Sequence, residues 1–216
     1  MGVRLIAGRA GTGKTHGCLA TIADELRRSL IEGPRLLFLV PEQAAMQMER
    51  ALLAGTGRGV LGRCEVISFR RLAHRIIADA EGSIPLPLTT LGREMALRYL
   101  IGRHRRELRE FSHVCDRGGF LSAICRGIAE LLQESVTVEQ ITESAARAEA
   151  ESHPSAARFH DLALLYRAYL NYLGDQRVDP ESVLDLARER LDGMAWLRGA
   201  GIWIDGFAGF TEQQLR

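Results

Sequence analysis

Residues 8–15 read GRAGTGKT, and this short stretch decides how the rest of the chain is interpreted. It fits the pattern G-x-x-x-x-G-K-[ST], in which backbone N–H groups, a lysine and a hydroxyl bind the phosphates of a nucleotide. Lys14 is the only lysine among the 28 basic residues. A compact ammonium passes beneath a tight turn where the broad guanidinium of arginine does not, so this choice supports the pattern. The predicted phosphate-binding residues are Gly8, Arg9, Ala10, Gly11, Thr12, Gly13, Lys14 and Thr15.

Length, charge and cysteine spacing narrow the class of protein. With 216 residues the chain can bury a full core and hold one or two domains. A net charge of +1 excludes a polybasic nucleic-acid coat but leaves room for a local basic groove. The four cysteines have neither metal spacing nor a C-x-x-C pair, which favours reduced thiols. Without a signal peptide or an apolar run of membrane length, we expect a cytoplasmic protein that does not enter a membrane.

Short apolar runs alternate with amphipathic stretches in the first part of the chain. The runs at 3–7, 35–40 and 64–68 predict buried strands, and the helical spacing of apolar residues predicts helices over 14–29, 42–53 and 69–80. A further apolar run predicts a strand at 201–205. Strands that alternate with helices indicate a parallel sheet covered on both faces. Together with the phosphate-binding pattern, this predicts an α/β fold of the P-loop NTPase (RecA-like) type.

A helical block interrupts this alternation. Helices are predicted over 91–109, 117–134, 138–150, 155–174 and 180–191, with no convincing strand among them. We therefore expect two domains. Residues 1–85 and 196–216 form the sheet domain, and residues 86–195 form an inserted all-helical subdomain.

The predicted strand at 201–205 ends in Asp205. An aspartate at the end of a strand downstream of a phosphate loop is the expected second half of a nucleotide site, so we expect Thr15 and Asp205 to hold Mg²⁺ together with ATP. The alternative is an aspartate that simply ends a surface strand.

The order of four segments resembles superfamily 1 helicases of the UvrD/RecB type. The phosphate loop is followed by VPEQAAMQMERAL at 40–52, ISFRRLAHRII at 67–77 and IDGFAGFTEQQ at 204–214. Two departures point to one family. Gly206 stands where active helicases carry the glutamate that activates water, and the chain has no place for their adenine-contacting glutamine before Gly8. With these departures the chain resembles the AddB family, the second subunit of AddAB-type helicase–nucleases, along all 216 residues.

This resemblance implies a helicase-like region without motor activity. It implies binding to single-stranded DNA and to the recombination hotspot Chi, at DNA ends and in complex with an AddA-type helicase–nuclease subunit. The family's subunit is several-fold longer, so we expect these residues to be its N-terminal part. Its nuclease and iron–sulfur cluster lie in the C-terminal part, so none of the four cysteines is assigned to the cluster.

Carried onto this chain, the resemblance implies DNA contacts just after three of the predicted strands. The candidate DNA-binding residues are Gln43, Phe69, Arg71, His74, Phe207 and Phe210. Aromatic rings stack on bases, arginine binds phosphates or base edges, and glutamine pairs with adenine. Phe69 is equally compatible with a place in the core. A run of arginines on the insertion is compatible with a DNA-facing stripe but fits an exposed helix face better; its members are Arg98, Arg103, Arg105, Arg106 and Arg109.

Three functions stay open on the sequence alone. The first is a catalytically silent helicase-like module that binds DNA in a repair complex, with ATP as a further ligand. The second is an active P-loop DNA-dependent ATPase or helicase domain, favoured by Lys14, Thr15 and Asp205. The third is a plain scaffold whose phosphate loop is a relic. For the motif itself, the alternative is a glycine-rich turn between a strand and a helix that carries its lysine by chance. The loss of a general base, which contributes roughly 10²–10⁴ in rate, favours the first.

Overall fold

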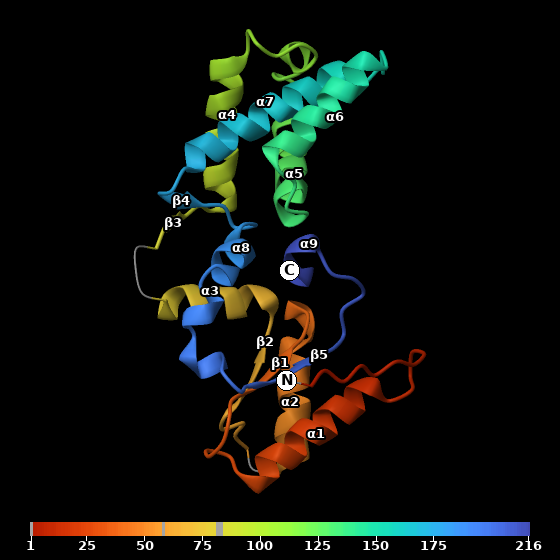
Figure 1. Cartoon of the computed structure of the whole chain (residues 1–216), viewed down its shortest axis with the longest axis vertical. Coiled ribbons are helices and arrows are strands. Elements are labelled where there is room, and N and C mark those ends of the chain that lie inside the picture. The colour runs from red at the N-terminus through yellow and green to blue at the C-terminus, as the bar shows by residue number, and fades with distance from the viewer. Residues whose placement is uncertain (1, 58, 81–83) are drawn as a thin grey trace. The chain divides into compact units, whose positions relative to one another are not determined.

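The computed structural model describes residues 2–57, 59–80 and 84–216. The chain divides into two compact units, which are considered one at a time (Figure 1). We call Met1–Glu81 with Leu186–Phe210 the sheet unit, and Gly82–Asp185 with Thr211–Arg216 the helical unit. The domain boundaries drawn from the sequence remain a prediction.

A three-stranded parallel sheet is the centre of the sheet unit. Its strand order is β2 (Cys64–Ile67), β1 (Leu36–Leu39), β5 (Gly201–Ile204). In register, Leu36 lies beside Cys64 on one side and Gly201 on the other. All four residues of β1 are buried, as a central strand with both faces covered requires. The predictions of an α/β fold and of strands near 35–40, 64–68 and 201–205 are confirmed.

The predicted strand at 3–7 is wrong for this structure. The segment belongs to no strand, and Val3 and Leu5 are 92% and 90% exposed. A strand needs a partner for its backbone N–H and C=O groups, and an apolar run alone does not supply one. In the described part of the chain, β5 pairs only with β1. The outer edge of β5 therefore forms no backbone hydrogen-bond ladder with residues 3–7. The full P-loop NTPase (RecA-like) sheet therefore remains a prediction.

Helices cover both faces of the sheet. The helices α1 (Lys14–Arg28) and α2 (Glu42–Thr56) pack with the side of β1 that carries Phe38, where Ile22 and Leu26 are fully buried. On the opposite side, α3 (Phe69–Asp79) brings Phe69 against Leu37 and Leu39. This alternation of Leu37 and Leu39 with Phe38 follows from the two-residue period of a strand.

Arg63 ties the end of α1 to the turn before β1. Its guanidinium donates to the backbone oxygens of Glu25 at 3.1 Å, Ser29 at 3.1 Å and Pro34 at 2.6 Å. These carbonyls include groups that a helix end leaves without a backbone partner, and a cation there also meets the negative end of the helix dipole. The side chain is only 8% exposed, so this contact fixes how α1 leads into the sheet.

The helical unit is built on α4 (Thr90–His104), α5 (Phe120–Gln133), α6 (Val138–Ala150) and α7 (Ala156–Leu173). Leu97, Ile128 and Leu165 are fully buried at its centre. The short helix α9 (Glu212–Leu215) belongs to this unit, where the Gln213 side chain donates to the Leu132 carbonyl at 2.9 Å. The predicted helices near 91–109, 117–134, 138–150 and 155–174 are thus present, the first of them shorter.

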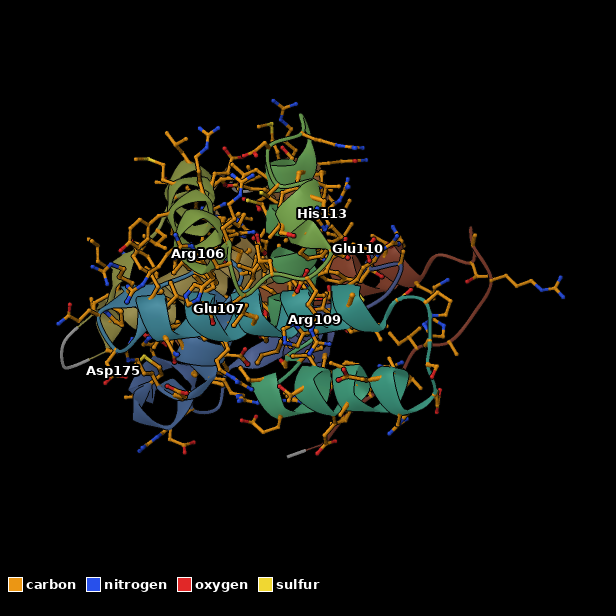
Figure 2. The ribbon with its side chains drawn as sticks, turned by 90° about the horizontal axis from the view of Figure 1, so that it is seen from above. Arg106, Glu107, Arg109, Glu110, His113 and Asp175 are labelled. Atoms are coloured by element: carbon orange, nitrogen blue, oxygen red, sulfur yellow. The ribbon has the colours of Figure 1, made fainter. Side chains whose placement is uncertain are left out.

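Asp161 binds the backbone beyond the end of α4, which stops at His104 and not at 109. Its buried carboxylate accepts backbone N–H bonds from Arg109, Glu110 and Phe111 at 2.8–2.9 Å. The backbone N–H groups of Glu107 and Leu108 both bond to the His104 carbonyl, so α4 has ended before these donors, and Asp161 holds the chain as it enters the 3₁₀ turn η1 (Phe111–His113). Figure 2 shows this end of the helical unit, with Arg109, Glu110 and His113 labelled.

The expectation of an all-helical insertion is also corrected. The two-residue strands β3 (Leu86–Pro87) and β4 (Arg177–Val178) pair in parallel within the helical unit. The predicted helix at 180–191 is reduced to α8 (Val183–Arg188), and the 3₁₀ turns η2 (Leu191–Gly193) and η3 (Ala195–Leu197) follow in the sheet unit. A strand of two residues is too short to produce an alternating pattern in the sequence.

A buried polar network connects α4 and α7 to the segment after β4. Arg93 Nε lies 2.9 Å from Asp179 Oδ2, and the Tyr169 hydroxyl donates to the same oxygen at 2.5 Å. Asp179 and Tyr169 are fully buried and Arg93 is 5% exposed. Burial, and then the bond to Asp179, raises the pKa of Tyr169, which therefore stays a proton donor to the carboxylate. The pair is costly to break, because the surviving charge would remain buried.

We predict that Asp179→Asn lowers the free energy of unfolding by about 3 kcal/mol, because it removes one member of this buried ion pair. The matched control is Asp175→Asn at an exposed position (labelled in Figure 2), which should change it by less than about 0.5 kcal/mol. Urea unfolding followed by circular dichroism measures both. Equal stability of the two variants would contradict a structural role for the pair.

Candidate functional site

The glycine-rich loop at residues 8–13 leads directly into α1. Gly11 and Gly13 have φ angles of +79° and +82°, a left-handed conformation that glycine adopts without steric cost. A side chain at Gly8 would place its Cβ 2.7 Å from Thr12 Oγ1. Gly13 is the N-cap of α1 and supplies no side-chain cap, so the first N–H groups of the helix remain available for an anion.

The Lys14 side chain folds back across this loop. Its ammonium donates to the carbonyl oxygens of Gly8 at 2.7 Å and Arg9 at 2.8 Å. The positive charge is therefore held over the concave side of the turn, next to the open end of α1. A phosphate group would find both the ammonium and the helix N-terminus at this point.

Thr15 and Asp205, which are 190 positions apart in the sequence, are in contact. The Thr15 hydroxyl donates to Asp205 Oδ2 at 2.6 Å. Asp205 directly follows β5, and its backbone N–H donates to Leu39 O at 3.1 Å, which extends the ladder with β1. On the next turn of α1, burial raises the pKa of the Cys18 thiol, and the negative charge of Asp205 adds to this effect.

The contacting oxygens fit a magnesium ion that is bound together with a nucleotide. One hydroxyl and one carboxylate are hard oxygen ligands, and Mg²⁺ usually completes its octahedron with water and phosphate oxygens. Among the described residues there is no group of three or more His, Cys, Asp or Glu side chains that could hold a metal without such help. The structure thus brings Thr15 and Asp205 together, and their role as metal ligands stays a prediction.

Gly206 follows Asp205 in a conformation that disfavours other residues. Its φ is +83°, and an added Cβ would lie 3.3 Å from Pro41 Cδ. Position 206, where the resemblance to active helicases would place a glutamate, is therefore tied to glycine by its own backbone and by Pro41, two residues after β1. The sequence shows that the glutamate is missing, and the structure adds the steric reason why it is not easily replaced.

Three phenylalanines form one cluster beyond the ends of β2 and β5. The ring centroids of Phe69 and Phe207 are 5.3 Å apart, those of Phe207 and Phe210 are 5.2 Å apart, and those of Phe69 and Phe210 are 6.3 Å apart. Phe69 also packs on the core beneath the sheet, whereas Phe210 is 44% exposed. Phe69 thus has the core contacts of the alternative interpretation, and its role in DNA binding stays a prediction.

The remaining candidates are exposed and lie outside the ring contacts of this cluster. Gln43 is the second residue of α2, just after β1, and Arg71 and His74 lie on α3. The Arg71 backbone N–H is bound by the Ser68 hydroxyl at 3.3 Å, which caps α3. Because Gln43, Phe69 and Phe207 follow the carboxyl ends of three parallel strands, they share one edge of the sheet, where open α/β sheets bind ligands.

Sequence reasoning missed the support beneath α3. The Arg75 guanidinium lies 4.7 Å from the Trp196 ring centroid and forms an ion pair with Glu65. Arg35 approaches the same ring at 5.6 Å. In the sequence, an arginine on an amphipathic helix suggests a solvated face. Only the structure shows that Trp196 in η3 comes back against the sheet unit and that Arg75 stacks on its ring.

Comparison with known proteins gives consistent matches. The family model described as "ADDB, N-terminal" matches residues 5–216. A protein of Heliobacterium modesticaldum, named as one subunit of an ATP-dependent helicase/deoxyribonuclease, is 44% identical over 100% of this chain and 18% of its own length. Proteins of the same name from Desulforudis audaxviator and Moorella thermoacetica are 41% and 39% identical, each over 99% of this chain. The chain thus spans 18–19% of the length of these relatives. No helix in its described part is long and apolar enough to cross a membrane.

We predict that Gly206→Ala lowers the free energy of unfolding by about 1 kcal/mol, because an L side chain at this φ is strained. Gly209→Ala is the control, since Gly209 has no positive φ and a Cβ there meets nothing within 4 Å. Thermal unfolding of both variants measures the difference. A Gly206→Ala variant as stable as Gly209→Ala would show that position 206 tolerates the side chain that a general base needs.

Proposed function

The chain belongs to the AddB family, whose N-terminal region it matches along nearly its whole length, and from this premise we propose that it is a helicase-like module that binds single-stranded DNA without working as a motor. The cluster of Phe69, Phe207 and Phe210 at the carboxyl edge of the sheet carries the proposal. It would act inside a helicase–nuclease subunit that repairs DNA double-strand breaks.

The chemistry of the cluster suits unpaired bases. A base has an apolar face that stacks on aromatic rings whatever its sequence, and Phe210 offers such a ring with 44% of its surface in solvent. Phe69 and Phe207 hold that ring in place from beneath. Arg71 and Gln43, both exposed at the same edge of the sheet, would bind phosphates and base edges.

The same edge supports nucleotide binding but not turnover. Lys14, the open N-terminus of α1 and the Thr15–Asp205 pair provide what binding of ATP with Mg²⁺ requires. Gly206 provides no general base and its backbone opposes the introduction of one. Binding without hydrolysis would make ATP a structural ligand here.

The wider setting follows from the relatives, each of which is named as one subunit of an ATP-dependent helicase/deoxyribonuclease. We propose that the chain works next to an AddA-type subunit at DNA ends and takes part in recognition of the hotspot Chi. As the resemblance to the family implies, an iron–sulfur cluster would belong to the C-terminal part of such a subunit.

The second candidate is an active DNA-dependent ATPase. One observation favours it, namely the 2.6 Å contact between Thr15 and Asp205, which is the geometry that a working magnesium site would use. This candidate also needs a general base, and Gly206 does not provide one. The base would have to come from another position.

We predict that Phe210→Ala weakens binding of a fluorescein-labelled oligo-dT about tenfold, because one stacked base is worth roughly 1–3 kcal/mol. Phe210→Tyr should retain the affinity, since it keeps a flat ring. The control is Phe159→Ala, which removes a phenylalanine that is 36% exposed on α7. Fluorescence anisotropy at fixed salt measures all three.

The opposite pattern would contradict DNA binding by the cluster. If Phe210→Ala binds oligo-dT as tightly as the unmodified chain, or if Phe159→Ala weakens binding as much, the phenylalanines serve only to pack the fold. Circular dichroism of each variant distinguishes a weaker DNA contact from an unfolded chain.

We also predict that the chain binds ATP with Mg²⁺ but does not hydrolyse it, with or without single-stranded DNA. Lys14→Ala should abolish the binding measured by calorimetry, because the ammonium is the charge aimed at the phosphates. A DNA-stimulated turnover of about 1 s⁻¹ that Lys14→Ala abolishes would instead establish the ATPase. If calorimetry detects no binding at millimolar ATP, the loop is a relic that no longer binds a nucleotide.

A further inference from the structure

The helical unit contains a hollow of about 360 Å³ that the candidate site does not use. It lies between α4, the segment at residues 115–119 and the first turn of α5. Three arginines line it, namely Arg98, Arg105 and Arg117, together with Gly118, Gly119 and Ser122. All of these residues belong to the helical unit.

The charge of this hollow is positive. Arg105 is neutralised by Asp116, which also lines the hollow and accepts from the Arg105 guanidinium at 3.1 Å. This pair holds Arg105 in place and raises its pKa. Within the described chain, Arg98 and Arg117 form no salt bridge and no side-chain hydrogen bond, and both are exposed. Two guanidinium groups thus remain free to bind an anion from solution.

The backbone adds donors to the same place. The N-cap of α5, Gly119, has a φ of +84° and no side-chain cap, and the first turn of this 14-residue helix carries no acidic residue. An added Cβ at Gly118 or Gly119 would meet nothing within 4 Å, so a ligand can approach the backbone closely there. The Ser122 hydroxyl lies in the lining as a further donor.

We propose that this hollow binds a phosphate of the DNA backbone and is a second DNA contact of the protein. Guanidinium groups bind phosphate oxygens through paired, charge-assisted hydrogen bonds, and two arginines that line this hollow form no ion pair within the described chain. No aromatic side chain lines the hollow, so it has no surface on which to stack the base of a free nucleotide. The proposal rests on the proposed function, because it assumes that single-stranded DNA is the ligand of the whole chain.

The first test asks whether DNA covers the two arginines in the unmodified chain. Phenylglyoxal modifies accessible arginines, and mass spectrometry of the digested protein reports each position. Oligo-dT should protect Arg98 and Arg117 and leave Arg147, an exposed arginine on α6, reactive. Inorganic phosphate, used as a separate probe, should protect the pair only at far higher concentration, because it lacks the adjoining contacts of a strand.

The second test measures the energetic part of the contact. The double variant Arg98→Gln/Arg117→Gln should bind labelled oligo-dT about tenfold more weakly at low salt. The slope of log Kd against log salt should fall by about 0.7 for each phosphate that the variant no longer neutralises. Arg147→Gln removes the same charge elsewhere and should leave the slope unchanged, and circular dichroism of the variants checks that the fold persists.

The outcomes separate this proposal from the proposed function. Protection by inorganic phosphate but not by DNA would overturn the assignment to DNA and make the hollow a site for a small phosphate compound. An unchanged affinity and salt slope in the double variant would overturn it as well. If Phe210→Ala has no effect while the double variant binds more weakly, the result supports DNA binding in the hollow and contradicts DNA binding by the aromatic cluster.

Discussion

The parallel pairing of β1 with both β2 and β5 is the constraint on which the rest of the sheet unit depends. It places Leu39 between Ile67 and Ile204, so the chain leaves all three strands at one edge. Everything assigned a function in this unit lies just after these positions or at the start of α1. The pairing of β1 with β5 brings together strands that are separated in the sequence by residues 40–200. Without this pairing, nothing would place Asp205 beside Thr15.

The sequence predicted the elements that carry their own signal. The buried run at 36–39 and the helical spacing of Ile22 and Leu26 are local patterns, and both elements formed where expected. It failed where a distant partner decides. Residues 3–7 contain the charged Arg4 among apolar side chains and are not held in a ladder, and the irregular turn after α4 is bound by Asp161, which lies 51 positions along the chain from Glu110.

The candidate site divides in the same way. The motif was sufficient to place Lys14 and Thr15 at the start of a helix, and the strand that ends in Asp205 was sufficient to suggest their partner. The left-handed Gly206 beside Pro41, the ring stacked under Arg75 and the arginine-lined hollow left no local signature. The first two arise from residues that are distant in sequence, namely Gly206 with Pro41 and Arg75 with Trp196. The hollow is lined by residues between 98 and 122, and it depends on how the chain folds between α4 and α5.

The distribution of the thiols has a practical consequence for spectroscopy. Burial raises the pKa of Cys18 and Cys125, and that of Cys64 to about 12, so at neutral pH these three hold almost no reactive thiolate. Cys115 is only half-buried and lies in the wall of the hollow. A maleimide dye added to the unmodified chain should therefore attach at one defined position. The protein then carries a natural attachment point for a fluorophore or spin label, without the removal of any other cysteine.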